Sequence, residues 1–491
     1  MPFSFCTFAA MSNIKPSLAK GTRDFSPIEM VKRNYIYDTI KKVFRKYGYA
    51  EIQTPSLENL STLTGKYGDE GDKLIFKILN SGDYLSKVNP EFLESRNSNG
   101  MIASISEKAL RYDLTVPFAR YVVMHQNEIT MPFKRFQVQP VWRADRPQKG
   151  RYREFYQCDV DVVGSASLLN EAEFILIYQE ALSKLKLTDF TIKINNRKIL
   201  SGIAEIIGKP NLIVDMTVAI DKLDKIGFEG VVSELLSKGF NNADIAKLEP
   251  IILLKGTNET KLIELERILA TSETGLLGVT ELKSVFSFLK LLSDFKFDEP
   301  SNFPNASRRK PGPKLEVDIT LARGLNYYTG CIFEVKTNEV KMGSIGGGGR
   351  YDDLTGMFGL KGLTGVGISF GADRIYDVLS ELELFPEMSS SGTQVLIVGL
   401  DSQVESSALR ILKHLRKKNI TAELYPKQVK LQKQMSYASA KKVPFVIIIG
   451  IDEVESGCLT IKDMLNGGQR TLELFRFFDI IKSKKSLRQL F

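Results

Sequence analysis

An apolar repeat of helical spacing opens the patterned part of the chain. Its members, three or four residues apart, are Ile36, Ile40, Val43, Phe44 and Tyr47. Such spacing places side chains on one face of a helix. Before the repeat, Ser26 and Glu29 form an S-x-x-E capping pair, with Pro27 at the first helical position. The pattern predicts a surface helix that ends at Gly48 and is followed by a short strand in YAEIQTP.

The next stretch, residues 110–164, favours β-structure with polar loops. FKRFQVQPVWR and EFYQCDVDVVG are rich in β-branched and aromatic residues and flank a basic loop. We expect them to pair as two strands of a hairpin.

From about residue 197 to 300 the apolar residues recur at helical spacing, as in the run Leu282, Val285, Phe286 and Leu289. A Pro-rich stretch, Glu299–Pro313, then leads back into the strand-like sequence LEVDITLARGLNYYTGCIFEV. This order predicts a helical module inserted into a β-rich domain.

A second polar linker, PEMSSSGT, precedes strands that alternate with helices, in TQVLIVGL, TAELY and PFVIIIG. This alternation predicts a small α/β domain with a largely parallel sheet. No internal repeat is visible. We therefore expect a disordered extension over 1–15, a β-rich domain over 16–385 containing the helical insertion over 197–305, a linker over 386–392 and the α/β domain over 393–491.

Composition narrows the class of protein only slightly. A chain of 491 residues is long enough for two or three domains, and its net charge of +9 favours anionic partners. Four widely separated cysteines and two histidines form neither a CxxC pair nor a zinc motif, which fits a reducing cytoplasm. No apolar run is long enough to predict a membrane span. MPFSFCTFAA lacks a basic n-region, so we expect the folded part to begin after Met11, with the translation start at Met1 or Met11 left open.

The hairpin loop concentrates positive charge. Its basic residues are Arg143, Arg146, Lys149, Arg151 and Arg153, with Pro147 and Gly150 between them. Arginine forks match phosphate geometry, so the loop suits a nucleotide or the end of a nucleic acid. A solvated surface hairpin explains the same composition equally well.

Three further stretches carry weaker signals. GSIGGGGRYDD could let a backbone approach a flat ligand, but taken alone it favours a flexible turn. GVGISFGADRI predicts a strand that leads into a helix carrying Arg374, with a salt bridge at the helix start as the simpler interpretation. Arg323 lies in an apolar context, where it needs either a ligand anion or a carboxylate such as Asp318 or Glu316.

Together and in this order, these stretches resemble the motifs of class II aminoacyl-tRNA synthetases, and specifically the histidyl-tRNA synthetases. KGTRDFSP and the helix to YAEIQTP resemble motif 1 (about 26–58), the basic hairpin resembles motif 2 (about 133–164), and GVGISFGADRI resembles motif 3 (about 365–380). LARGLNYYTG and GSIGGGGRYDDLTGMFG resemble the two histidine-specific sequences. The resemblance implies an antiparallel class II β-sheet catalytic core with a helical insertion, plus a C-terminal α/β anticodon-binding domain.

The resemblance also implies roles at matching positions. Arg143 would hold the α-phosphate of ATP, Arg323 would bridge that phosphate and the histidine carboxylate, and Arg374 would meet the γ-phosphate or adenine. The implied histidine-binding residues are Asp113, Thr115, Gln157, Asp161, Arg323, Tyr327 and Tyr328. The implied contacts to the tRNA acceptor end are Arg146, Lys149 and Arg151.

By the same resemblance, Asp113 and Thr115 line the amino-group side, Asp161 pairs with the ammonium or polar edge, and the two tyrosines bound the imidazole. The reaction implied is ATP-dependent charging of tRNA(His) with L-histidine, with Mg²⁺ but no zinc, by a cytoplasmic homodimer. Asn326 departs from the Asp that the family commonly has.

Two other classes of protein could share these sequence motifs. One is a paralogue that has lost aminoacylation, like the regulatory subunit of ATP phosphoribosyltransferase. The retained Arg143, Arg323 and Arg374 and the sequence after residue 393 count against it. The other is a non-catalytic RNA-binding protein, which would not need Asp161 or the tyrosine pair.

Overall fold

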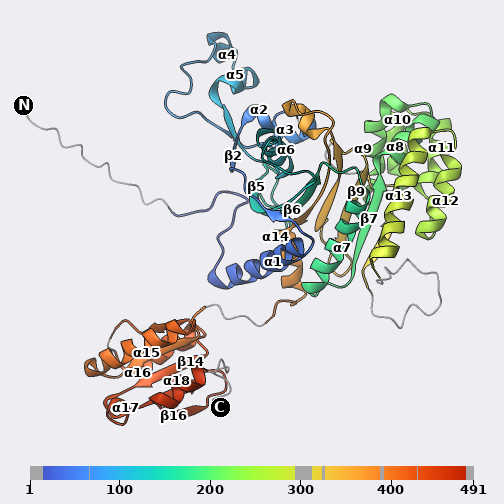
Figure 1. The fold of residues 1–491 in the computed structure, drawn as a ribbon. Coiled ribbons are helices and arrows are strands. Elements are labelled where there is room, and N and C mark those ends of the chain that lie inside the picture. The colour runs from blue at the N-terminus through green and yellow to red at the C-terminus, as the bar shows by residue number, and fades with distance from the viewer. Residues whose placement is uncertain are drawn as a thin grey trace, which may run out of the picture. The chain divides into compact units, whose positions relative to one another are not determined.

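The computed structural model describes residues 15–65, 67–293, 312–322, 327–386, 392–427 and 429–482 (Figure 1). The chain forms two compact units. The larger takes in most of the chain up to Leu384, and the smaller combines Asp24–Asn34 with the residues from Phe385 on. The expected extension at residues 1–15 and linker at residues 386–392 fall mostly outside the described residues.

A large mixed sheet is the centre of the larger unit. Its eight strands in the described residues run in the order β1 (Ala50–Glu51), β5 (Phe133–Trp142), β6 (Glu154–Val163), β11 (Thr364–Gly371), β10 (Gly346–Asp352), β9 (Cys331–Thr337), β7 (Phe190–Asn196) and β8 (Lys314–Val317). Every pair from β5 to β7 is antiparallel, and the two edge strands, β1 and β8, pair in parallel.

The predicted hairpin is confirmed. β5 and β6 pair antiparallel from Phe133 opposite Val163 to Trp142 opposite Glu154. Because side chains alternate across a strand, every second residue of β6 points to the same face of the sheet. That alternation decides which of its side chains meet at the site.

The prediction of mainly β-structure over residues 110–164 is wrong at one place. Residues Thr115–Met124 form the helix α6. Its β-branched and aromatic residues suggested a strand, but they also fit a helical face, since Phe118, Ala119 and Val122 are buried. Asp113 accepts a hydrogen bond from the backbone N–H of Val116 at 3.2 Å, which satisfies one of the free donors at the helix start.

The predicted first helix is confirmed as α1 (Pro27–Lys46). The N–H of Ser26 donates to the Glu29 carboxylate at 2.7 Å, and Gly48 follows the helix with a φ of 82°. In the larger unit, the ring of Phe44 on α1 packs against the ring of Phe370 on β11, with 5.8 Å between the ring centroids. The ring of Tyr178 on α7 (Leu169–Lys184) packs against the same phenylalanine, with 4.7 Å between the centroids. The two helices therefore cover one face of the sheet (Figure 1).

A small sheet and short helices separate α1 from the hairpin. The strands are β2 (Leu57–Asn59), β4 (Lys108–Leu110) and β3 (Lys77–Ile78), and the helices are α2 (Leu60–Leu63), α3 (Gly68–Lys73), α4 (Pro90–Glu94) and α5 (Ser98–Ile105). A cluster of buried side chains from this region includes Tyr67 and Tyr112, whose rings lie 4.5 Å apart. This cluster supports one wall of the site.

The helical module is confirmed. It consists of α8 (Arg197–Ile206), η1 (Pro210–Leu212), α9 (Ile213–Ile220), α10 (Leu223–Ser237), α11 (Asn242–Ile252), α12 (Asn258–Ile268) and α13 (Glu273–Leu292). Helices α8 and α13 pack closely at Gly202 and Gly275. A Cβ added to Gly202 would lie only 2.5 Å from the Cα of Gly275, so the close approach requires glycine there.

The smaller unit is an α/β domain, but its sheet is only partly parallel. Its strands run in the order β13 (Ala422–Leu424), β12 (Val395–Gly399), β14 (Phe445–Ile449), β15 (Cys458–Asp463) and β16 (Gln469–Glu473), with helices η4 (Ser402–Val404), α15 (Glu405–Lys417), α16 (Leu431–Ala440), α17 (Ile451–Glu455) and α18 (Leu474–Lys482). The first three strands are parallel and the last two antiparallel. The single short helix α17 between β14 and β15 does not supply the dozen residues that a parallel crossover needs.

No helix in the described part of the chain is long and apolar enough to cross a membrane.

Candidate active site

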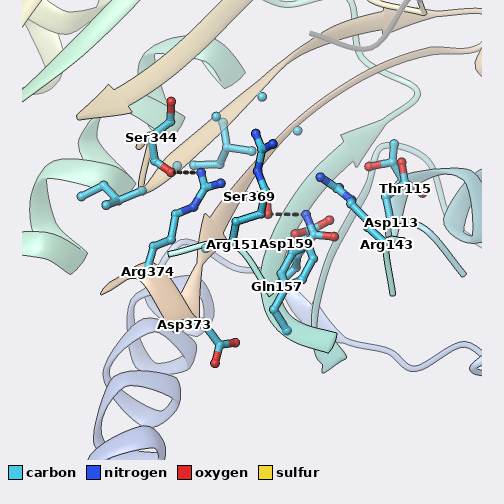
Figure 2. A pocket seen from close by; sticks show the side chains of 18 of the residues that line it. Asp113, Thr115, Arg143, Arg151, Gln157, Asp159, Ser344, Ser369, Asp373 and Arg374 are labelled. Atoms are coloured by element: carbon cyan, nitrogen blue, oxygen red, sulfur yellow. Dashed lines mark hydrogen bonds between the residues drawn. The ribbon is translucent and has the colours of Figure 1, made fainter. Parts of the chain in front are cut away.

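A cavity of about 290 Å³ lies over the middle of the large sheet (Figure 2). It brings together most of the site residues predicted from sequence, namely Asp113, Thr115, Arg143, Arg151, Gln157, Asp161, Tyr327, Tyr328 and Arg374. Arg146 and Lys149 do not line it, and Arg323 and Asn326 lie outside the described residues. Its remaining walls come largely from the glycine-rich strand and from β6.

The glycine-rich stretch is a strand in the sheet, so its interpretation as a flexible turn is wrong. Gly346–Asp352 forms β10, which pairs with both β9 and β11. A Cβ on Gly348 would lie 2.2 Å from the carbonyl oxygen of Gly367, and one on Gly367 would lie 1.9 Å from Oδ1 of Asp161. Glycine at these positions therefore lets strands and a buried carboxylate approach closely.

The arginine of the same stretch is structural. Arg350 is buried and forms a two-point ion pair with Glu171 of α7, with N–O distances of 2.5 and 2.8 Å. Its Nη1 also donates to the Ser165 carbonyl at 3.2 Å. This pair ties β10, which lines the cavity, to the helix behind the sheet.

Arg143 stands at the base of the basic loop. Its Nε donates to the Tyr112 carbonyl at 3.1 Å, and its guanidinium lies over the rings of Tyr112 and Phe155, at 4.2 and 5.2 Å from their centroids. Among the described residues its Nη atoms have no hydrogen-bond partner. The side chain is therefore held in place with its terminal donors available at the cavity wall.

Arg374, at the start of α14 (Ala372–Glu381), connects the loop to the strand region. Its Nε donates to the Gly150 carbonyl at 2.7 Å and its Nη1 to the Ser344 carbonyl at 2.6 Å. Gly150 has a φ of 72°, which favours glycine in this turn. The loop tip is held separately, since the exposed Lys149 pairs with Glu381 at 2.7 Å.

Arg23, in the KGTRDF segment, was not singled out from sequence. It forms an ion pair with Asp373, and its guanidinium lies 3.4 Å from the ring centroid of Tyr152 in the basic loop. The Gly21 carbonyl accepts a hydrogen bond from the N–H of Arg153 at 2.9 Å. The segment before α1 thus fixes one side of the loop, and the expected salt bridge at the start of α14 is present with Arg23 as partner.

Three buried carboxyl groups line the cavity: Asp113, Asp159 and Asp161. The Tyr67 hydroxyl donates to Asp113 at 3.0 Å. Asp161 accepts a hydrogen bond from the Tyr351 hydroxyl at 2.8 Å. Burial raises the pKa of all three carboxyl groups, and that of Asp159 to about 7.

Asp159 was missed in the sequence analysis. The signal was present, because Gln157 and Asp161 were both predicted to face the substrate and Asp159 lies between them at strand spacing. Its Oδ1 atom is buried and has no hydrogen-bond partner in the described residues.

In the described part of the chain no three His, Cys, Asp or Glu side chains are grouped to hold a metal ion.

Comparison with known proteins identifies the family. A family model described as Histidyl-tRNA synthetase matches residues 104–375, and one described as Anticodon binding domain matches residues 394–484. A histidine–tRNA ligase from Phocaeicola vulgatus is 55% identical over 469 residues, which cover 96% of this chain and 99% of that protein.

Solved structures agree. The crystal structure of histidyl-tRNA synthetase from Nostoc sp. PCC 7120 has a TM-score of 0.77 at 30% identity, covering 96% of this chain and 100% of its own. One from Bacillus halodurans C, described as an ATP phosphoribosyltransferase regulatory subunit/histidyl-tRNA synthetase, has a TM-score of 0.66 at 19% identity, covers 89% of this chain and 99% of its own, and supports the fold alone. The expected class II core with a C-terminal anticodon-binding domain is confirmed. The chain belongs to the histidyl-tRNA synthetase family.

Proposed function

We propose that the chain is an ATP-dependent histidine–tRNA ligase that activates L-histidine as histidyl adenylate and transfers it to the 3′ end of tRNA(His). The observation that supports this best is the composition of one cavity. Buried carboxylates line it together with Arg143 and Arg374, so it offers acceptors for a cation beside donors for phosphate. Histidine and ATP together present that combination.

In the first step an oxygen of the histidine carboxylate forms a bond to the α-phosphorus of ATP. The bond from that phosphorus to the pyrophosphate oxygen breaks, and pyrophosphate leaves. Arg143 would hold the α-phosphate, because its Nη donors are available where its guanidinium is fixed over two rings. Arg374 would meet the γ-phosphate or adenine, and Mg²⁺ carried by ATP would further neutralise the leaving group.

Arg323 is assigned to bridge the histidine carboxylate and the α-phosphate, and this role rests on the sequence resemblance. Its two alternative partners are engaged elsewhere: Asp318 pairs with Lys193 at 2.6 Å, and Glu316 with Lys261 at 3.2 Å. In the second step the terminal ribose hydroxyl of tRNA attacks the carbonyl carbon of the adenylate, and AMP leaves. No side-chain nucleophile is required.

The histidine end of the cavity would recognise the side chain through hydrogen bonds. Asp113 and Thr115 would line the amino-group side, and Tyr327 and Tyr328 would bound the imidazole. The Tyr327 hydroxyl lies 3.4 Å from Oδ2 of Asp113. A site built to hydrogen-bond a polar substrate rejects apolar analogues by roughly 10⁴-fold, so no editing domain is needed.

The tRNA would contact three parts of the chain. We assign the acceptor end to Arg146, Lys149 and Arg151, the acceptor arm to the helical insertion, and the anticodon to the C-terminal domain. A homodimer and a cytoplasmic location complete the proposal, both on the family resemblance. Charging of tRNA(His) by the purified chain with radiolabelled histidine tests the overall reaction, and a folded chain that charges no tRNA would contradict it.

Lys149→Glu should weaken tRNA charging more than histidine activation. Lys149 lies at the exposed loop tip outside the cavity, whereas Arg151 lines the cavity and its loss should affect both steps. We expect the KM for tRNA to rise about tenfold, the loss of one charged hydrogen bond, while pyrophosphate exchange stays within about twofold. Steady-state charging and exchange assays measure the two effects.

Glu381→Gln is the matched control, because it breaks the same Lys149–Glu381 ion pair and keeps the lysine. It should leave tRNA affinity unchanged or improve it. Equal losses of tRNA charging and pyrophosphate exchange in Lys149→Glu would contradict the assignment of the loop tip to the tRNA acceptor end.

A further inference from the structure

Arg111 is a buried cation that does not line the cavity. It follows β4 and comes directly before Tyr112 and Asp113. Its side chain is fully buried, and burial lowers the pKa of its guanidinium to about 10. No described carboxylate is paired with it, and the nearby Glu58 instead forms a two-point ion pair with Arg120, with both N–O distances at 2.8 Å. The positive charge of Arg111 therefore has no neighbouring anion to compensate it.

The guanidinium of Arg111 instead holds backbone carbonyl groups of two other segments. Its Nη1 atom donates to the carbonyl oxygens of Thr54 and Pro55, at 2.7 and 3.1 Å, where the YAEIQTP segment ends. Its Nε atom donates to the carbonyl oxygen of Pro140 on β5 at 2.8 Å. Three carbonyl groups thus depend on one side chain. The planar fork of an arginine has donors enough for this, whereas a lysine ammonium cannot match the same fixed geometry.

These bonds support one edge of β5 where no strand does. On that side β1 pairs with β5 only up to Phe136, and no other described strand follows it. Pro140 has no backbone N–H, and its carbonyl oxygen is held by Arg111. The carbonyl oxygen of Arg111 in turn accepts a hydrogen bond from the N–H of Trp142 at 3.1 Å. Arg111 therefore replaces a neighbouring strand along the last residues before Arg143.

The side chain of Arg143 is held by the residue that follows Arg111. Its Nε atom donates to the carbonyl oxygen of Tyr112 at 3.1 Å, and its guanidinium lies 4.2 Å from the centroid of the same tyrosine ring. Arg143 itself lines the cavity (Figure 2). Both its backbone and its guanidinium are thus supported by residues 111 and 112, so a shift of these two residues would displace Arg143.

Stability alone does not account for a group like Arg111. Its Nη2 atom is buried and has no hydrogen-bond partner in the described part of the chain. A buried charge without a counter-charge, with a donor left unused, costs free energy of folding. Exceptions of this kind are typical of places where exact geometry matters for function.

We propose that Arg111 is a positioning residue for histidine activation: it fixes Tyr112 and the end of β5, and thereby sets the place of the Arg143 guanidinium. The inference rests on the proposed function, in which Arg143 holds the α-phosphate of ATP. Arg111 touches no substrate itself. A displacement of about 1 Å at a group aligned with the reacting atoms can lower a rate by roughly 10²-fold.

The first test is Arg111→Lys, which keeps the charge but cannot hold all three carbonyl groups. The kcat of histidine-dependent pyrophosphate exchange should fall by about 10- to 100-fold. The KM for ATP should change by less than about threefold, because the misplaced contact is one that matters most in the transition state. Rates are compared at a temperature at which circular dichroism shows both proteins to be folded.

A double-mutant cycle shows whether Arg111 acts through Arg143. In Arg143→Ala there is no guanidinium left to position, so the addition of Arg111→Lys should lower the remaining exchange rate by less than about twofold. If the losses of the two single variants multiply in the double variant, Arg111 acts independently of Arg143 and the proposal is wrong.

Arg120→Lys is the matched control. Arg120 is a largely buried arginine of α6 that pairs with Glu58 and does not line the cavity. The substitution should lower the unfolding temperature but leave the exchange rate of the folded protein within about twofold, because Arg120 holds none of the three carbonyl groups. An equal fall of kcat in Arg120→Lys and Arg111→Lys would trace the loss to general destabilisation and overturn the proposal.

The single tryptophan of the chain, Trp142, reports on the same place. Its ring centroid lies 5.8 Å from the guanidinium carbon of Arg111. Quenching of its fluorescence by acrylamide should increase in Arg111→Lys and stay unchanged in Arg120→Lys. Unchanged quenching in Arg111→Lys would contradict a role in holding the end of β5.

Arg111→Gln is a second variant in case the lysine variant does not fold. It removes the uncompensated charge and keeps one donor, and the same fall in kcat is expected. Wild-type exchange by either folded variant, beside an active wild type, would overturn this inference alone. Absence of exchange by the folded wild type would overturn the proposed function, and this inference with it.

Discussion

Arg143→Ala should lower histidine-dependent pyrophosphate exchange by about 10²- to 10³-fold, the usual effect of removing one fixed donor from a developing oxyanion. The nucleophile and the α-phosphate are both anionic, so the step depends on cations that are in place before reaction. Arg143 fits this role because one backbone hydrogen bond and two ring contacts fix its guanidinium. The loss should appear mainly in kcat, measured by exchange at saturating ATP and histidine.

Arg143→Lys is the matched control. A lysine retains the charge but lacks the planar fork, so it should recover only part of the lost rate. Binding of tRNA by either variant should remain close to wild type, because Arg143 lies at the loop base. Exchange within a few fold of wild type in Arg143→Ala would remove this residue from the catalytic machinery.

Arg350→Ala should destabilise the larger unit by about 3–5 kcal/mol, because it leaves the carboxylate of Glu171 buried without its partner. The two-point pair with Glu171 is almost wholly inaccessible to solvent, and it connects the cavity strand β10 to α7. Denaturant unfolding followed by circular dichroism would measure the loss.

The double variant Arg350→Met with Glu171→Leu tests the cause. Replacing both charges by apolar side chains of similar size removes the unpaired carboxylate, so much of the stability should return. If the double variant is as unstable as the sum of the single variants, the loss comes from packing and the ion pair has no special part in it.

The sequence predicted correctly those helices and strands whose residue patterns fit only one kind of secondary structure. The capping residues Ser26 and Glu29 and the terminating Gly48 marked α1, and the β5–β6 hairpin followed from two strand-like runs around a polar loop. The helix α6 was missed because its Val and Phe residues suit a strand as well as a helical face. Strand β15 runs antiparallel to β14, because the connection through α17 is short. The alternation of strands and helices along the sequence does not reveal this reversal.

Long-range contacts set the limits on predicting the site. Nothing local in GSIGGGG distinguishes a flexible turn from a strand, whereas the structure shows that Gly348 and Gly367 are required by neighbouring atoms. Likewise, the sequence near Arg23 contains no sign of Asp373, which lies 350 positions later in the chain. Asp159 lies at strand spacing between Gln157 and Asp161, so its place in the cavity could have been predicted, but the lack of a partner for its Oδ1 atom is a property of the folded chain.

A solved structure that is described partly as an ATP phosphoribosyltransferase regulatory subunit shares the fold of this chain. A shared fold does not imply a shared activity. The high identity to a histidine–tRNA ligase over nearly the whole of both chains favours the catalytic interpretation, as does the cavity that contains Arg143 and Arg374.

The most direct test of histidine activation is ATP–pyrophosphate exchange by the purified full chain, with each of the twenty amino acids in turn. We predict exchange with histidine alone, at a rate that falls by at least about 10²-fold in Arg143→Ala. A well-folded chain that exchanges with no amino acid, or that exchanges equally well with several, would contradict the assignment of this cavity to histidine activation.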